Sequence, residues 1–75
     1  MLQHINQPSL HSQIALANTY YRQGAYTKAI MIYSSIRSTS PQIKQQLYYN
    51  IANAYAKKAS YTKARLYYAK ALQLG

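Results

Sequence analysis

Residues Tyr61–Ala64 read YTKA, and the same four letters stand 35 positions earlier, at Tyr26–Ala29. The agreement extends outward when the chain is aligned with itself at this spacing. Identical pairs include Ala17 with Ala52, Asn18 with Asn53, Tyr20 with Tyr55, and Tyr33 with Tyr68. A period of this length is typical of proteins built from repeated supersecondary units. The 75 residues are therefore expected to contain two copies of one unit.

Each unit has the sequence pattern of two helices. Apolar residues recur three and four positions apart, and no segment alternates with a period of two, which predicts helices without strands. Ser9 and the pair Ser40–Pro41 are helix start signals, and Gly24 can end a helix. We expect helices from about residue 9 to 23, 26 to 38, 41 to 58, and 61 almost to 75.

The apolar stripe of each expected helix gives a candidate core. Small and amphipathic side chains dominate it, because the chain has ten Tyr but no Phe, Trp or Cys. The residues expected to pack inward are Leu10, Ile14, Leu16, Ala17, Tyr20, Tyr26, Ala29, Ile30, Tyr33, Ile36, Ile43, Leu47, Tyr48, Ile51, Ala52, Tyr55, Tyr61, Ala64, Tyr68, Ala71 and Leu72.

The charge balance is strongly one-sided. Nine Lys and Arg residues stand against no Asp or Glu, which gives a formal charge of +9. Such a chain repels itself when compact and attracts polyanions, so added anions should stabilise the fold by screening. The densest basic cluster is expected on a solvated surface and comprises Lys57, Lys58, Lys63 and Arg65.

The second unit, YYNIANAYAKKASYTKARLYYAKALQLG, resembles the tetratricopeptide repeat (TPR) family over its whole length. Tyr48 stands where the family often has Trp, and Ile51, Ala52 and Tyr55 match the next part of its motif. The resemblance implies an all-α fold in which two helix-turn-helix hairpins stack as a short right-handed α-solenoid. Residues 10–40 would form unit 1 and 41–75 unit 2, after a flexible lead-in of residues 1–9.

The sequence departs from the family at surface positions where acids are common. Ala25, Ser60, Thr27 and Thr62 occupy such positions in the two turns. This pattern favours an engineered variant or an excised fragment. The second unit is also similar to TPR segments beside von Willebrand A domains in bacterial aerotolerance-type membrane proteins.

The resemblance implies a peptide-binding role on the concave face, which the first helix of each hairpin lines. Asn can pair with the backbone amides of an extended peptide, and Arg and Lys can bind carboxylates. The residues at these positions are Asn18, Tyr21, Arg22, Tyr49, Asn50, Asn53 and Lys57. The carboxylate clamp of some family members is incomplete here, since Ile14 occupies its first Lys position.

Catalysis is not expected, because the chain offers no carboxylate or thiol side chain as base or nucleophile. His4 and His11 lack a third metal ligand, so neither a metal site nor a cofactor is predicted. No apolar run approaches the length of a membrane span. The expected function is a non-catalytic protein-interaction or scaffold module.

Two alternatives remain open. One is a basic domain that binds nucleic acid or another polyanion, in which Tyr21, Tyr49 and Tyr67 stack on bases. The other is an acid-free protein made to test folding, with no physiological ligand.

Self-association is expected because fewer than three repeats are marginally stable. The last helix should expose parts of Tyr61, Leu66, Leu72 and Leu74. We therefore predict a homodimer, formed through stacked end faces or by exchange of a hairpin across residues 39–41.

Overall fold

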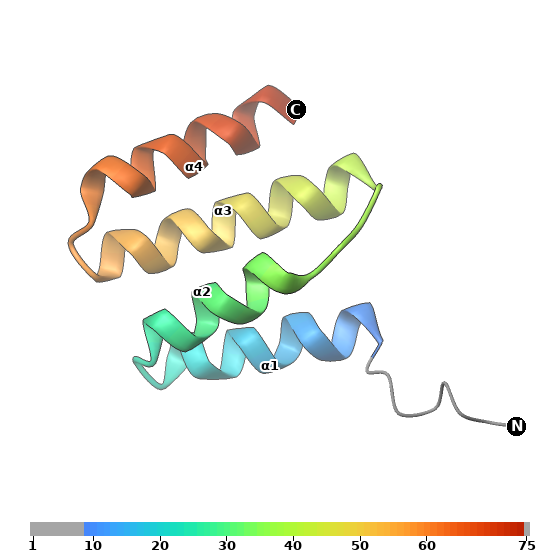
Figure 1. Cartoon of the computed structure of the whole chain (residues 1–75), viewed down its shortest axis with the longest axis horizontal. Helices are drawn as coiled ribbons and strands as arrows, with labels where there is room; N and C mark the ends of the chain where they lie inside the picture. The colour runs from blue at the N-terminus through green and yellow to red at the C-terminus, as the bar shows by residue number, and fades with distance from the viewer. Residues whose placement is uncertain (1–8, 75) are drawn as a thin grey trace, which may run out of the picture.

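The computed structural model describes residues 9–74, which form four α-helices and no strand. Helix α1 spans Leu10–Arg22, α2 spans Tyr26–Ser35, α3 spans Pro41–Lys57, and α4 spans Tyr61–Leu74. Each helix packs against the next one along the chain, as α1·α2, α2·α3 and α3·α4 (Figure 1). Over the residues that the structure describes, the prediction of an all-α fold with four helices is confirmed. Eight of the nine residues in the expected lead-in lie outside the described residues.

Both serine start signals act as helix N-caps. The Ser9 hydroxyl accepts a hydrogen bond from the Ser12 amide at 3.1 Å, and the Ser40 hydroxyl accepts one from the Ile43 amide at 3.3 Å. Pro41 follows in the first turn of α3, where its missing N–H costs nothing. These bonds satisfy amides that have no partner within their own helix.

The two hairpin turns have the same geometry. Gly24 closes the first turn with φ +83°, and Ala59 takes the equivalent left-handed conformation in the second with φ +62°. The Ala25 amide donates to the Tyr20 carbonyl at 2.9 Å, and the Ser60 amide donates to the Tyr55 carbonyl at 2.9 Å. The 35-residue repeat in sequence is therefore also a repeat of backbone hydrogen bonds.

Alanine sets the close approach of the helices within each hairpin. Ala17 and Ala29 have no exposed surface in the first hairpin, and Ala52 and Ala64 are 0% and 3% exposed in the second. The hairpins join through α2 and α3, whose buried side chains belong to one cluster. This cluster consists of Ile14, Ala17, Ala29, Ile30, Tyr33, Ile36, Leu47, Ile51 and Ala54.

Helix α2 ends at Ser35, three residues before the expected end near Ser38. Ile36 leaves the helix in an extended conformation, with φ −78° and ψ 129°, and its side chain is buried in the core. The buried apolar face of this segment thus extends one residue beyond the end of α2. The periodicity of the sequence included Ile36 but could not distinguish a helical from an extended backbone.

Three residues of the expected core lie at the surface. Leu16, Tyr61 and Leu72 are exposed. The assignment of Leu16 to the core is therefore wrong, whereas Tyr61 and Leu72 belong to the apolar stripe of α4 that was expected to remain partly exposed. Tyr61 lacks an aromatic neighbour, because Ala56 occupies the position at which Tyr21 packs edge-on against the equivalent Tyr26. The partial exposure expected for Tyr61, Leu66, Leu72 and Leu74 is confirmed: the first three are exposed and Leu74 is half-buried.

Within residues 9–74, no helix combines the length and the apolar character that a bilayer crossing requires.

The two turns predict opposite effects of exchanging their central residues. Ala59→Gly should stabilise the protein by about 0.5–1 kcal/mol, because glycine adopts a positive φ without steric cost. Gly24→Ala should destabilise it by about 1 kcal/mol, since an added Cβ meets no atom within 4 Å and only the backbone conformation is penalised. Urea unfolding measures both changes. Effects of the same sign for the two substitutions would contradict the equivalence of the turns.

Candidate functional site

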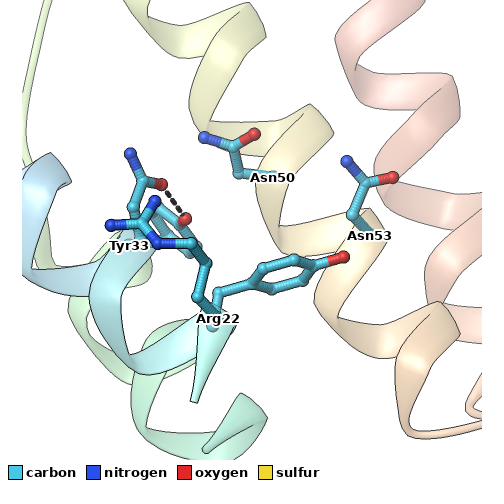
Figure 2. Close-up of a pocket in the computed structure, with 6 residues that line it drawn as sticks. Arg22, Tyr33, Asn50 and Asn53 are labelled. Atoms are coloured by element: carbon cyan, nitrogen blue, oxygen red, sulfur yellow. Dashed lines mark hydrogen bonds between the residues drawn. The ribbon is translucent and has the colours of Figure 1, made fainter. Parts of the chain in front are cut away.

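A pocket of about 250 Å³ opens between the first helices of the two hairpins. Asn18, Tyr21 and Arg22 line it from α1, and Asn50 and Asn53 line it from α3. Tyr33 of α2 completes the wall (Figure 2). We call this the asparagine pocket. Five of the seven residues predicted to form a binding face therefore meet at one place.

The same tyrosine–asparagine hydrogen bond occurs in both hairpins. The Tyr33 hydroxyl donates to Asn18 Oδ1, and the Tyr68 hydroxyl donates to Asn53 Oδ1. Both bonds connect the first helix of a hairpin to its second helix, and they are related by the 35-residue repeat. With its oxygen engaged by tyrosine, each asparagine presents its amide N–H groups as free donors.

Burial favours the protonated form of both tyrosines. The pKa of Tyr33 is raised above 10.0, chiefly by desolvation and further by Tyr21, while Arg22 acts to lower it. The pKa of Tyr68 is raised for the same principal reason, with smaller contributions from Tyr49 and Tyr21. Both hydroxyls consequently remain hydrogen-bond donors across the neutral pH range.

Two side chains of the asparagine pocket have unused hydrogen-bonding capacity. The amide of Asn50 and the guanidinium of Arg22 form no hydrogen bond with the residues that the structure describes. Asn50 can both donate and accept, and Arg22 offers five N–H donors in a planar fork. The pocket therefore combines amide groups that suit a peptide backbone with one cation that suits a carboxylate.

The other two predicted site residues lie elsewhere. Tyr49 is exposed and lines a separate pocket of about 600 Å³ together with Tyr68, Ala71 and Leu72. Lys57 is exposed and does not line the asparagine pocket. It occupies the position in unit 2 that Arg22 occupies in unit 1, but no described helix lies beyond it to form a second wall.

Tyr33 is the member of the asparagine pocket that the sequence did not assign to a site. Its position in the repeat marked it as a core residue, and the ring is indeed only 2% exposed. The available signal was the repeated pair itself, because Asn and Tyr stand 15 residues apart in both units. A pair retained in both copies indicates that the two side chains act together.

The tyrosines considered as surface stackers are mostly engaged within the fold. Tyr21 packs edge-on against Tyr26 with ring centres 5.4 Å apart, and Tyr67 stacks on Tyr55 at 5.6 Å. Tyr21 and Tyr67 are both half-buried. Of the three, only Tyr49 has a largely exposed ring.

Part of the expected basic cluster also makes contacts within the chain. Lys58 Nζ donates to Thr27 Oγ1 at 2.7 Å, and Lys63 Nζ lies 5.5 Å from the centre of the Tyr55 ring. The latter contact repeats that of Lys28 with Tyr20, at 5.3 Å. Cation–π contacts of this kind stabilise exposed side chains by roughly 0.5–1 kcal/mol.

The described residues contain no group of three potential metal-ligating side chains. His11 lies on exposed surface of α1, and His4 falls outside the described residues.

Comparison of the chain with models of protein families, with curated proteins and with solved structures finds no significant match.

Proposed function

We propose that this protein is a non-catalytic interaction module of the TPR type, with two hairpins stacked as a short solenoid. The observation that carries the proposal is the asparagine pocket, which the first helices of both hairpins line together. Support for the repeat comes from the duplicated turns and the duplicated tyrosine–asparagine bonds. The proposal of the TPR family itself rests on the resemblance of the second unit to the TPR motif.

The proposed ligand is an extended peptide that carries at least one carboxylate. Asn18 and Asn50 stand on facing helices and can hold a peptide backbone by its carbonyl and N–H groups. Arg22 at the edge can pair with a carboxylate in two parallel hydrogen bonds. The formal charge of +9 would speed the encounter with an acidic partner.

The alternative function, binding of nucleic acid or another polyanion, has less support. A groove for single-stranded nucleic acid needs exposed rings along a basic track. Tyr21 and Tyr67 are packed against neighbouring rings. Of the three candidate tyrosines, only Tyr49 is therefore largely exposed, and a single ring does not form a track. Nucleic-acid binding is therefore one alternative outcome of the binding experiment.

The test selects binders from a peptide library rich in Asp and Glu, at a salt concentration of about 0.15 M. Asn50→Ala should weaken the tightest selected peptide about tenfold, because it removes the hydrogen bonds of one amide from a partly desolvated site. Arg22→Gln should weaken it to a similar extent. Calorimetry or fluorescence anisotropy measures the dissociation constants.

Two matched controls separate the pocket from general attraction. Gln46→Ala removes an exposed amide from the same helix outside the asparagine pocket, and Arg65→Gln makes the same charge change on α4. Both should bind the peptide as the unaltered protein does. Failure to select any peptide, or equal losses for Arg22→Gln and Arg65→Gln, would contradict the proposal. Salt-sensitive binding of a random oligonucleotide that exceeds peptide binding would favour the polyanion reading.

We further propose that the protein forms a homodimer through the open end of its second hairpin. In the first hairpin, Ile14, Tyr33 and Ile36 are buried in the cluster that also contains Leu47 and Ile51 of α3. Their equivalents in the second hairpin are Tyr49, Tyr68 and Ala71, which line the 600 Å³ pocket together with Leu72. Leu72 is 78% exposed, so a second copy would remove considerable apolar surface from water.

Sedimentation equilibrium tests this dimer. Leu72→Gln should shift the equilibrium toward monomer, because it places an amide in an apolar interface. Leu66→Gln is the matched control, since Leu66 is an exposed leucine of α4 that does not line the 600 Å³ pocket. A protein that stays monomeric at high micromolar concentration, or a dimer that both substitutions weaken equally, would rule out this interface.

A further inference from the structure

A third pocket, of about 380 Å³, lies where the α2–α3 linker meets α3 and α4. Three cationic side chains line it, and each comes from a different element: Arg37 from the linker, Lys44 from α3 and Lys70 from α4. We call this the basic pocket. Arg37 and Lys44 are seven residues apart in the chain, whereas Lys70 follows 26 residues after Lys44, so the packing of α4 against α3 brings Lys70 to the same hollow.

No side-chain carboxylate of this chain can neutralise the three cations, because the 75 residues include no Asp or Glu. Like charges around one hollow repel one another, and this repulsion persists until an anion enters. A ligand with two or more negative charges would gain attraction from all three cations at once. The hollow is therefore electrostatically suited to a polyvalent anion.

The walls of the basic pocket also carry hydroxyl groups. Ser34, Ser38, Tyr48 and Tyr67 are among its lining residues. Hydroxyl groups donate hydrogen bonds to oxyanions but cannot neutralise them. Beneath them, the buried side chains of Ile36 and Leu47 form an apolar floor, which lowers the local dielectric and strengthens charge pairing.

Two residues that line the basic pocket, Lys70 and Ser38, make contacts within the chain. Lys70 Nζ lies 5.6 Å from the centre of the Tyr48 ring and 5.7 Å from that of Tyr67. In the linker, the Ser40 amide donates to Ser38 Oγ at 3.1 Å, one residue beyond Arg37. Of the three cations, Lys70 is thus positioned over two rings of the pocket wall, whereas Arg37 and Lys44 have exposed side chains.

We propose that the basic pocket binds a small polyvalent phosphate anion. Arg37, Lys44 and Lys70 neutralise its charge, and the serine and tyrosine hydroxyls donate to its oxygens. The basic pocket shares one lining residue, Tyr33, with the asparagine pocket, and its three cations are not part of the peptide-binding proposal. The Lys57–Lys58–Lys63–Arg65 cluster differs from it, because those residues line none of the three pockets described above.

The test uses inorganic pyrophosphate as the probe, with ionic strength held constant by sodium chloride. Titration calorimetry should show one pyrophosphate bound per chain. Lys44→Gln and Arg37→Gln should each weaken binding about tenfold, because each removes one charge-assisted contact. Lys57→Gln and Arg65→Gln are matched controls that lower the net charge equally outside the pocket, and they should bind pyrophosphate as the unaltered protein does.

A second measurement needs no variant and stands even if a substitution impairs folding. Amide chemical shifts of the unaltered protein should move at Ser38, Lys44 and Lys70 during the pyrophosphate titration, while those of Lys57 and Lys63 stay nearly constant. Shifts spread over all the basic residues, or equal losses of affinity for pocket and control variants, would overturn the proposal. Either outcome would reduce the effect to general attraction by a charge of +9.

Discussion

A hydrogen bond between a tyrosine hydroxyl and an asparagine side chain joins the two helices of each hairpin. Because the asparagine lies on the first helix and the tyrosine on the second, the bond requires both helices to keep one register. Alanine at Ala17, Ala29, Ala52 and Ala64 lets the helices approach closely enough for that bond to form. The turns with positive φ then set where each second helix begins. The asparagine pocket follows from these constraints, since they orient the asparagine amides.

The functional surfaces arise where the two units differ rather than where they agree. Ile36 is buried against α3 in the first unit, whereas its equivalent Ala71 leaves space that becomes part of the 600 Å³ pocket. Arg22 and Lys57 are equivalent in the repeat, yet only Arg22 has a neighbouring hairpin to form a pocket with. The two hairpins share a single interface, which forms the asparagine pocket. The other face of the second hairpin has no neighbouring hairpin among the described residues.

Much of the fold could be predicted from sequence because its signals are local. Serine caps, the Gly24 turn and the three-and-four spacing of apolar residues depend only on neighbouring positions, and the helices begin where these signals stand. The predicted end of α2 near Ser38 and the predicted burial of Leu16 were wrong, because both depend on which surfaces the other helices cover. Five residues of the asparagine pocket were predicted through the resemblance to the TPR family. The convergence of Lys70 with Arg37 and Lys44 had no sequence signal, since the packing of α4 against α3 brings it there.

The most direct test of the account is a pair of double-mutant cycles on the two tyrosine–asparagine bonds. One cycle combines Asn18→Ala with Tyr33→Phe, the other combines Asn53→Ala with Tyr68→Phe, and urea unfolding gives each free energy. A favourable coupling of about 1 kcal/mol is predicted between Asn18 and Tyr33. A smaller but still favourable coupling is predicted between Asn53 and Tyr68, because Tyr68 is only half-buried. Simple additivity in both cycles would contradict the claim that this bond sets the register of each hairpin.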